Sequence, residues 1–485
     1  MCVFALAGLG GAGSFVERST QDQAVPEPDP KVDEPRVEDE PESETPTVGL
    51  REAVALALER NFGIRASAEG VETARINEGA ARAQFYPKIT PAIRGSADDR
   101  TFSVDGAQRL PWLGGSVSSS AAYRATTRQD ALFASTSDLR LTLSQPLLRG
   151  FGPAMTMYDL RNSRRNRQGR ERAHDLDRQR LAEDVTGVFY QVVKQRQLLA
   201  VAQQSQQRSL RLKEASEARL KVGLASKLDV LRAELQASQA EAAAVAAQSG
   251  LENALERFRF LLALPPAHPL EPEPIELPSA AEGDLEPLEV LVLRARENRL
   301  DLQETRDQVE DARRTLSVAR QRLLPQIDLN VGVTWSGYGS TFSESRGALD
   351  RRTDVFLTTS YPLERASDLA AKASAEMSLG AHERLLEQKL LEVETDVRAA
   401  VRDLERMRKA VELQRKNVEL AEQQHRLATL RYERGLASNF DVVQAEEDVF
   451  SARTSLVGLL ADYQVGRVRL RRVSGGLDVS TEFWK

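Results

Sequence analysis

Two serine–aspartate pairs carry the most suggestive spacing of reactive side chains in the chain. Ser226 precedes Asp229 by three residues, and Ser438 precedes Asp441 by the same distance. A serine hydroxyl followed three residues later by an acid can satisfy the free N–H groups at the start of a helix. The spacing therefore predicts that a helix begins at each pair and carries a carboxylate in its first turn.

The chain contains few of the side chains that catalysis or metal binding would need. The only cysteine is Cys2, and the four histidines are scattered at His174, His268, His382 and His425. This set excludes a disulfide framework and offers no zinc-ligand spacing. The sequence pairs no nucleophile with a base and contains no phosphate-binding loop. An enzyme is therefore the least expected class, and no cofactor or metal is predicted.

Composition narrows the class of protein further. The 485 residues include 66 Lys and Arg against 72 Asp and Glu, a balance that argues against a nucleic-acid partner. Aromatic residues make up only 5%, which argues against a compact enzyme core. No run of about 18 apolar residues occurs, so a membrane-spanning helix is excluded, whereas a membrane strand is not.

The N-terminal region reads as a leader followed by a tether. Residues 2–13 form an apolar run that ends in small residues, although no basic residue precedes it. We interpret residues 1–20 as a truncated signal peptide. Residues 21–46 are acidic and rich in proline, which predicts a disordered tether. The glycines at 8–13 match a dinucleotide-binding pattern, but the prolines that follow exclude the helix such a site needs.

The chain contains two copies of one plan. Residues 219–236 and 431–448 are identical at nine of eighteen positions, at an offset of 212. Residues 81–90 and 319–328 also match, as do 137–147 and 353–363. Matched blocks in the same order indicate a duplication. The predicted parts are a first repeat over 47–264, a proline-rich linker over 265–284, a second repeat over 285–476 and a tail over 477–485.

Each repeat is predicted to run as a helix, strands, a very long helix, a tight turn and another long helix. Stepping alternately four and three residues from Leu386 to Ala428 meets apolar residues at eleven of thirteen positions. A period of 3.5 residues is typical of a coiled-coil seam. Gly223 and Gly435 suit the left-handed residue that ends a helix. The pattern predicts two antiparallel helical hairpins.

Alternation of polar and apolar residues predicts the strands. In residues 138–143, Leu139, Leu141 and Leu143 would share one face, and Arg140 and Thr142 the other. Residues 327–335 alternate in the same way. This pattern fits either a sandwich or a barrel with lipid outside and water inside. The Ser- and Ala-rich stretch within 112–128 is interpreted as an extra extracellular hairpin.

Three motifs resemble the TolC-like outer membrane efflux protein family. They are T-V-G-L-R-E-A-V-A-L-A-L-E-R-N at 47–61, S-Q-P-L-L-R-G at 144–150, and the two G-L-A-S-x-x-D-V turns. The resemblance covers about residues 47–476. It implies a mainly α fold with a membrane β-barrel. Long antiparallel coiled-coil helices would form an α-barrel, and four strands per chain would complete a 12-stranded barrel in a homotrimer.

The resemblance also implies a function and its partners. The protein would be the outer-membrane exit duct of a tripartite efflux or type I secretion system in a Gram-negative-type bacterium, in contact with outer-membrane lipid and extending into the periplasm. A periplasmic adaptor and an inner-membrane pump would be its partners. Two alternatives stay open. An adaptor also carries a helical hairpin, but only one, and a coiled-coil scaffold leaves the amphipathic strands unexplained.

Site residues follow from the resemblance by position. Asp441 matches a gate aspartate, and Gln444 stands where a second acid is frequent. Tyr432 and Asp229 match the tyrosine and aspartate of a link that closes the periplasmic gate, whereas Ala437 replaces an arginine partner. The adaptor would dock on two turns, formed by Gly223, Leu224, Ala225 and Ser226 and by Gly435, Leu436, Ala437 and Ser438.

Overall fold

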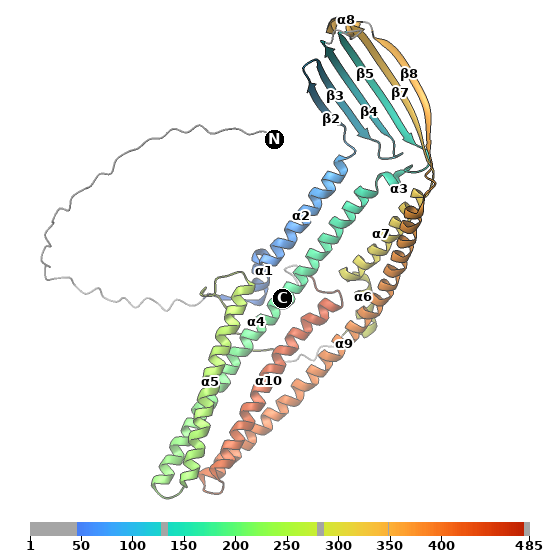
Figure 1. The fold of residues 1–485 in the computed structure, drawn as a ribbon. Coiled ribbons are helices and arrows are strands. Elements are labelled where there is room, and N and C mark those ends of the chain that lie inside the picture. Colours follow the sequence, from blue (N-terminus) through green and yellow to red (C-terminus); the bar gives the residue numbers. More distant parts are fainter. Residues whose placement is uncertain (1–45, 128–133, 279–285, 348, 480–485) are drawn as a thin grey trace, which may run out of the picture. The chain divides into compact units, whose positions relative to one another are not determined.

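The computed structural model describes residues 46–127, 134–278, 286–347 and 349–479 (Figure 1). All of them belong to the unit that contacts define from Pro46 onward. The expected signal peptide at 1–20 lies outside the described residues, as does all of the expected tether except Pro46. Among the described helices, none combines the length and the apolar character needed to cross a bilayer.

Six strands form one antiparallel sheet, which Figure 1 shows side by side. Every neighbouring pair is antiparallel. The strands, in their order across the sheet, are β2 (Lys88–Gly95), β3 (Asp99–Arg109), β4 (Ser116–Thr126), β5 (Ser135–Pro146), β7 (Gln326–Gly339) and β8 (Asp350–Ser360). The first repeat supplies four of these strands and the second supplies two.

The number of strands corrects the expectation of four per chain. The additional pair is β3 and β4, and the stretch 112–128 supplies one strand of that hairpin rather than a hairpin by itself. Sequence alternation missed β4 because its side chains are mostly Ser and Ala, which give little contrast between the two faces. Its pairing with Phe102 and Val104 of β3, through Tyr123 and Ala121, fixes the register.

One face of the sheet is apolar. The register places Leu139 between Ala121 and Trp335, and it places Leu141 opposite Val333. Arg140 and Thr142 alternate with these leucines and therefore point to the other face. Large apolar side chains of this face are exposed to solvent in the isolated chain. They include Ile89, Ile93, Phe102, Val104, Leu139, Leu141, Leu143, Val355 and Leu357, and we call this surface the apolar face.

Helices make up the rest of each repeat. The first contains α1 (Leu50–Arg60), α2 (Phe62–Ala83), α3 (Pro153–Thr156), α4 (Tyr158–Lys221) and α5 (Lys227–Leu261). The second contains α6 (Leu288–Asn298), α7 (Leu300–Arg322), α8 (Phe342–Gly347), α9 (Ala366–Glu433) and α10 (Asn439–Val473). The 64 residues of α4 correspond to a length of about 96 Å at ~1.5 Å per residue. Short parallel strands β1 (Thr47–Val48) and β6 (Glu271–Pro272) pair with each other.

The helices pack as the predicted hairpins, α4 with α5 and α9 with α10. The seam of α5 buries a row of alanines, among them Ala233, Ala237 and Ala240, whose small side chains let the helices approach closely. The largest apolar cluster includes Phe189 of α4 and Phe258 of α5, whose rings meet edge to face at 6.2 Å. These contacts hold α4 and α5 together along the first hairpin.

Candidate functional site at the hairpin tips

Each hairpin ends in a turn whose backbone conformation is fixed by hydrogen bonds and by a glycine with positive φ. At the first turn the Leu224 N–H donates to the Arg219 carbonyl at 2.8 Å, and the Gly223 N–H donates to the Leu220 carbonyl at 3.0 Å. Gly223 has φ +73°, a conformation that favours glycine. This pair of bonds is the Schellman ending of a helix. The glycine expected to end α4 is therefore confirmed.

The second turn repeats this geometry. The Leu436 N–H donates to the Arg431 carbonyl at 2.8 Å, and the Gly435 N–H donates to the Tyr432 carbonyl at 3.0 Å. Gly435 has φ +71°. The exposed fraction of the Leu436 side chain is 70%, and that of Leu224 at the first turn is 78%. Both tips thus present a leucine that their own chain leaves uncovered.

The predicted capping boxes are present at both tips. The Asp229 carboxylate accepts from the Ser226 hydroxyl at 2.7 Å and from the Ser226 N–H at 3.0 Å. The Asp441 carboxylate accepts from the Ser438 N–H and hydroxyl, both at 2.9 Å. The Ser226 hydroxyl and N–H lower the pKa of Asp229, and the Ser438 N–H and hydroxyl lower the pKa of Asp441. Both carboxylates are therefore ionised caps near neutral pH.

A polar link joins the two hairpins just above the tips. The hydroxyls of Tyr432 and Ser216 share a hydrogen bond of 3.2 Å. The Asn439 side-chain amide donates to the Ser216 hydroxyl at 2.8 Å and to the Asp229 carbonyl at 2.9 Å. Arg219 lies over the Tyr432 ring at 4.1 Å and donates to the Tyr432 carbonyl at 2.8 Å. The link is buried, since Ser216, Tyr432 and Asn439 are all closed to solvent.

This geometry differs from the direct link expected between Tyr432 and Asp229. The Asp229 carboxylate is occupied by its own cap, so only its backbone carbonyl takes part, and Ser216 receives the tyrosine. Sequence reasoning missed Ser216 and Asn439, and it related Arg219 to the end of α4 rather than to this link. One signal was available, because Tyr432 and Asn439 occupy positions where the two copies of the repeated block differ.

The remaining gate candidates lie on open surface of this chain. Asp441 and Gln444 are both exposed, and Gln444 donates to the Asp448 carboxylate at 3.4 Å. Ala437 is half-buried in the second turn and has no polar group to form a link. Within one chain these side chains form no joint site. Within the described ranges, no group of three or more His, Cys, Asp or Glu residues could hold a metal ion.

A buried ion cluster ties three long helices together farther from the tips. Glu446 of α10 is only 3% exposed. Its carboxylate accepts from the Arg208 guanidinium of α4 at 2.7 Å and from the Ser205 hydroxyl at 2.8 Å. His425 of α9 lies 3.2 Å from the same carboxylate, and burial lowers the pKa of His425. The cluster fixes α4 of the first hairpin against both helices of the second.

Comparison with known proteins identifies the family. The sequence profile described as outer membrane efflux protein matches residues 53–264 and 291–476, well over half of the chain. The chain belongs to the outer membrane efflux protein family. The family is one of outer membrane transport proteins rather than enzymes, and membership leaves the adaptor and scaffold alternatives without support.

Two relatives within the outer membrane efflux protein family come from Pseudomonas putida. The toluene efflux pump outer membrane protein TtgC is 27% identical over 187 residues, which are 37% of this chain and 37% of TtgC. The antibiotic efflux pump outer membrane protein ArpC matches with the same identity and the same shares. The chain thus matches only about a third of the length of these relatives.

Solved structures of outer membrane proteins share the fold over most of the chain. The outer membrane protein VceC from Vibrio cholerae has a TM-score of 0.68 at 16% identity, covering 88% of this chain and 96% of VceC. The CmeC outer membrane channel of Campylobacter jejuni has a TM-score of 0.67 at 13% identity, covering 95% of both chains. The expected fold class, long antiparallel helices joined to a β-sheet, is confirmed by these likenesses.

Proposed function

We propose that this outer membrane efflux protein is the passive exit duct of a tripartite efflux or type I secretion system. A homotrimer would carry small molecules or proteins across the periplasm and the outer membrane, with a periplasmic adaptor and an inner-membrane pump. The observation that carries the proposal is the exposed apolar face of a sheet whose strands lead into helices of 64 and 68 residues. Such a face suits lipid, and helices of that length suit a tunnel.

The sheet also supports closure between copies of the chain. Its two edges are β2 and β8, and an even number of strands makes these edges run in opposite directions. Edge strands expose unpaired backbone groups, which a barrel removes. Antiparallel pairing of β2 with β8 of the next copy would continue the sheet around the ring. Three copies of a six-stranded sheet would give eighteen strands instead of the twelve expected from the resemblance.

We further propose that the hairpin tips close the periplasmic end of the duct and that the adaptor docks on them. Asp441 and Gln444 of three chains would line the periplasmic constriction, and the link through Tyr432 would hold the hairpins closed. Two hairpins per chain in a trimer would present six similar tips, on which adaptor hairpins would pack at Leu224 and Leu436. Exposed leucines at a rigid turn support this assignment, because such side chains favour a protein partner.

Arginine in place of Leu141 tests the lipid-facing assignment. We expect a loss of about 2–4 kcal/mol in barrel stability if Leu141 lies at the bilayer midplane, and far less for arginine at Thr142. The fraction of protein that refolds into lipid vesicles, measured across a urea series, reports this difference. Equal tolerance at the two neighbouring positions would show that the strand does not face lipid.

Phenylalanine in place of Tyr432 tests the closing link. The change removes a hydroxyl bond to Ser216 worth about 1 kcal/mol, so the open fraction of a two-state channel should rise about five-fold. Planar-bilayer recordings measure that fraction. Tyr463→Phe is the matched control, because the buried Tyr463 makes no side-chain hydrogen bond within the described residues. An unchanged open fraction in Tyr432→Phe would remove the link from the gate.

Asparagine in place of Asp441 separates gating from capping. If three Asp441 carboxylates line the constriction, the change removes three charges from the narrowest point, and ion selectivity should shift. The helix start should survive, because asparagine is also a good cap. Selectivity is read from reversal potentials under a salt gradient. Unchanged selectivity with an intact fold would leave Asp441 as a cap alone.

Fractionation tests the proposal as a whole. The protein should sediment with outer membranes, require detergent for extraction and migrate as a trimer in crosslinking. Recovery as a detergent-independent monomer would overturn the proposal.

A further inference from the structure

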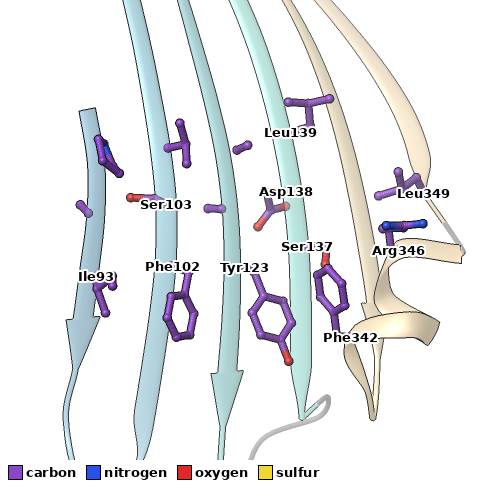
Figure 2. A pocket seen from close by; sticks show the side chains of 15 residues that line it. Ile93, Phe102, Ser103, Tyr123, Ser137, Asp138, Leu139, Phe342, Arg346 and Leu349 are labelled. Atoms are coloured by element: carbon purple, nitrogen blue, oxygen red, sulfur yellow. The ribbon is translucent and has the colours of Figure 1, made fainter. Parts of the chain in front are cut away.

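An apolar groove with a volume of about 530 Å³ lies on the apolar face beside α8 (Figure 2). Its floor comes from Ile93 of β2, Phe102 of β3, Ala121 of β4 and Leu139 of β5. Phe342 and Arg346 of α8 form its wall, and Figure 2 shows both beside the strand side chains. This volume lies within the range of small-molecule sites.

Helix α8, which forms the wall of the groove, is held on the sheet by close packing, a hydrogen bond and an aromatic contact. A Cβ atom at Gly337 would collide with the carbonyl oxygen of Ser345, so only glycine at this position lets α8 lie so close to β7. The hydroxyls of Ser345 and Ser137 share a hydrogen bond of 2.8 Å. Phe342 meets the Tyr123 ring edge to face, with centroids 4.9 Å apart. The groove is therefore a built feature of the β7–β8 connection.

The residues around α8 match the chemistry of a bilayer interface. Tyr123, Trp335 and Phe342 lie on the apolar face, and aromatic side chains gather where a membrane barrel meets the headgroups. Arg346 and Arg351 are both exposed there, and neither forms an ion pair within the described ranges. Free arginines are costly at the bilayer midplane and favourable beside phosphate groups. These features place this end of the sheet at headgroup level.

We propose that the groove binds one acyl chain of an outer-membrane lipid whose phosphate group pairs with Arg346. The inference depends on the proposed position of the apolar face in the bilayer. Side chains alternate along β5, so the Asp138 carboxylate points to the other face of the sheet. Among the described residues that form the floor of the groove, no carboxylate therefore opposes an acyl chain or a phosphate group. The floor continues along β5 from Leu139 to Leu141 and Leu143, and a lipid can therefore enter sideways from the bilayer.

Native mass spectrometry of the detergent-extracted full-length protein tests the site. The protein is incubated with phosphatidylglycerol or phosphatidylcholine carrying the same acyl chains, and retained lipid is counted per chain. We expect one retained lipid, with phosphatidylglycerol preferred. Arg346→Gln should lower retention of phosphatidylglycerol about five-fold, to the level of phosphatidylcholine, because an arginine close to an anionic headgroup contributes that much. Arg352→Gln is the matched control, since Arg352 lies on the other face and pairs with Asp354.

Filling the groove tests the acyl-chain part of the inference. Ala121→Trp should abolish retention of both lipids, whereas Ser119→Trp, on the same face but outside the groove, should leave retention unchanged. Wild-type retention in Ala121→Trp, or an unchanged lipid preference in Arg346→Gln, would overturn the inference. Outer-membrane fractionation of the wild type reports separately on the proposed function, so failure of the groove and failure of the duct give different results.

Discussion

Glutamate in place of Leu436 is expected to abolish export while trimers still assemble. Leu436 is 70% exposed, so its own chain gains little from it, and a surface change of this kind alters stability by only about 0.5 kcal/mol. Against an apolar adaptor surface, the same carboxylate would lose its water without gaining a partner. Cellular accumulation of a fluorescent efflux substrate measures export, and crosslinking measures assembly.

The docking experiment needs a control at the same position. Leu436→Met keeps an apolar side chain of similar volume and should retain export. A photo-crosslinker at position 436 should capture the adaptor in the periplasm, and one at 224 should do so at the first tip. Normal export in Leu436→Glu, or the absence of any periplasmic protein crosslinked at either position, would contradict docking at the tips.

Alanine in place of Arg208 should lower the free energy of unfolding of the helical part by about 3–5 kcal/mol. The change leaves the Glu446 carboxylate buried without its cation, and an uncompensated buried charge is strongly destabilising. In the intact cluster burial lowers the pKa of His425, so Arg208 rather than His425 supplies the positive charge beside Glu446 near neutral pH. Loss of the helical circular dichroism signal in urea measures the change.

A control variant and a double variant show whether the effect of Arg208→Ala comes from the buried charge of Glu446. Lys213→Ala breaks an ion pair with Glu234 that joins α4 to α5 within the first hairpin, but this pair is more open to solvent and should contribute only about 0–1 kcal/mol. Arg208→Met combined with Glu446→Leu removes both charges and should recover most of the lost stability. If Arg208→Ala costs no more than Lys213→Ala, the cluster does not hold the two hairpins together.

Interactions between residues close together in the sequence could be predicted, whereas contacts between residues far apart in the sequence could not. The caps formed by Ser226 and Ser438 were predicted correctly because each depends on residues only three positions apart. The partner of Tyr432 could not be predicted in this way, since Ser216 lies 216 residues earlier and belongs to the other hairpin. Glu446 gave no signal either, because its burial arises only when α10 packs on α4.

The strands also divide into those that the sequence pattern predicts and those that only pairing with distant residues reveals. In β5, leucines alternate with polar residues, and the two faces were predicted from that contrast alone. In β4, serine and alanine give almost no contrast, so the strand emerges only through its pairing with β3 and β5. The count of strands was therefore taken from the family resemblance, and the sheet exceeds that count by one hairpin.

The tips are preorganised. A Schellman ending closes one side of each turn and a capping box closes the other, so few backbone groups stay free to reorient. A partner that docks there loses little conformational entropy in ordering the turn, and the binding energy of a single leucine counts almost in full. The two tips share this scaffold but differ in flanking side chains, with Val222 and Lys227 at one and Arg434 and Asn439 at the other. Each tip thus carries one cation among these four positions, Lys227 after the first turn and Arg434 before the second, so one kind of partner would bind the two tips with different affinities.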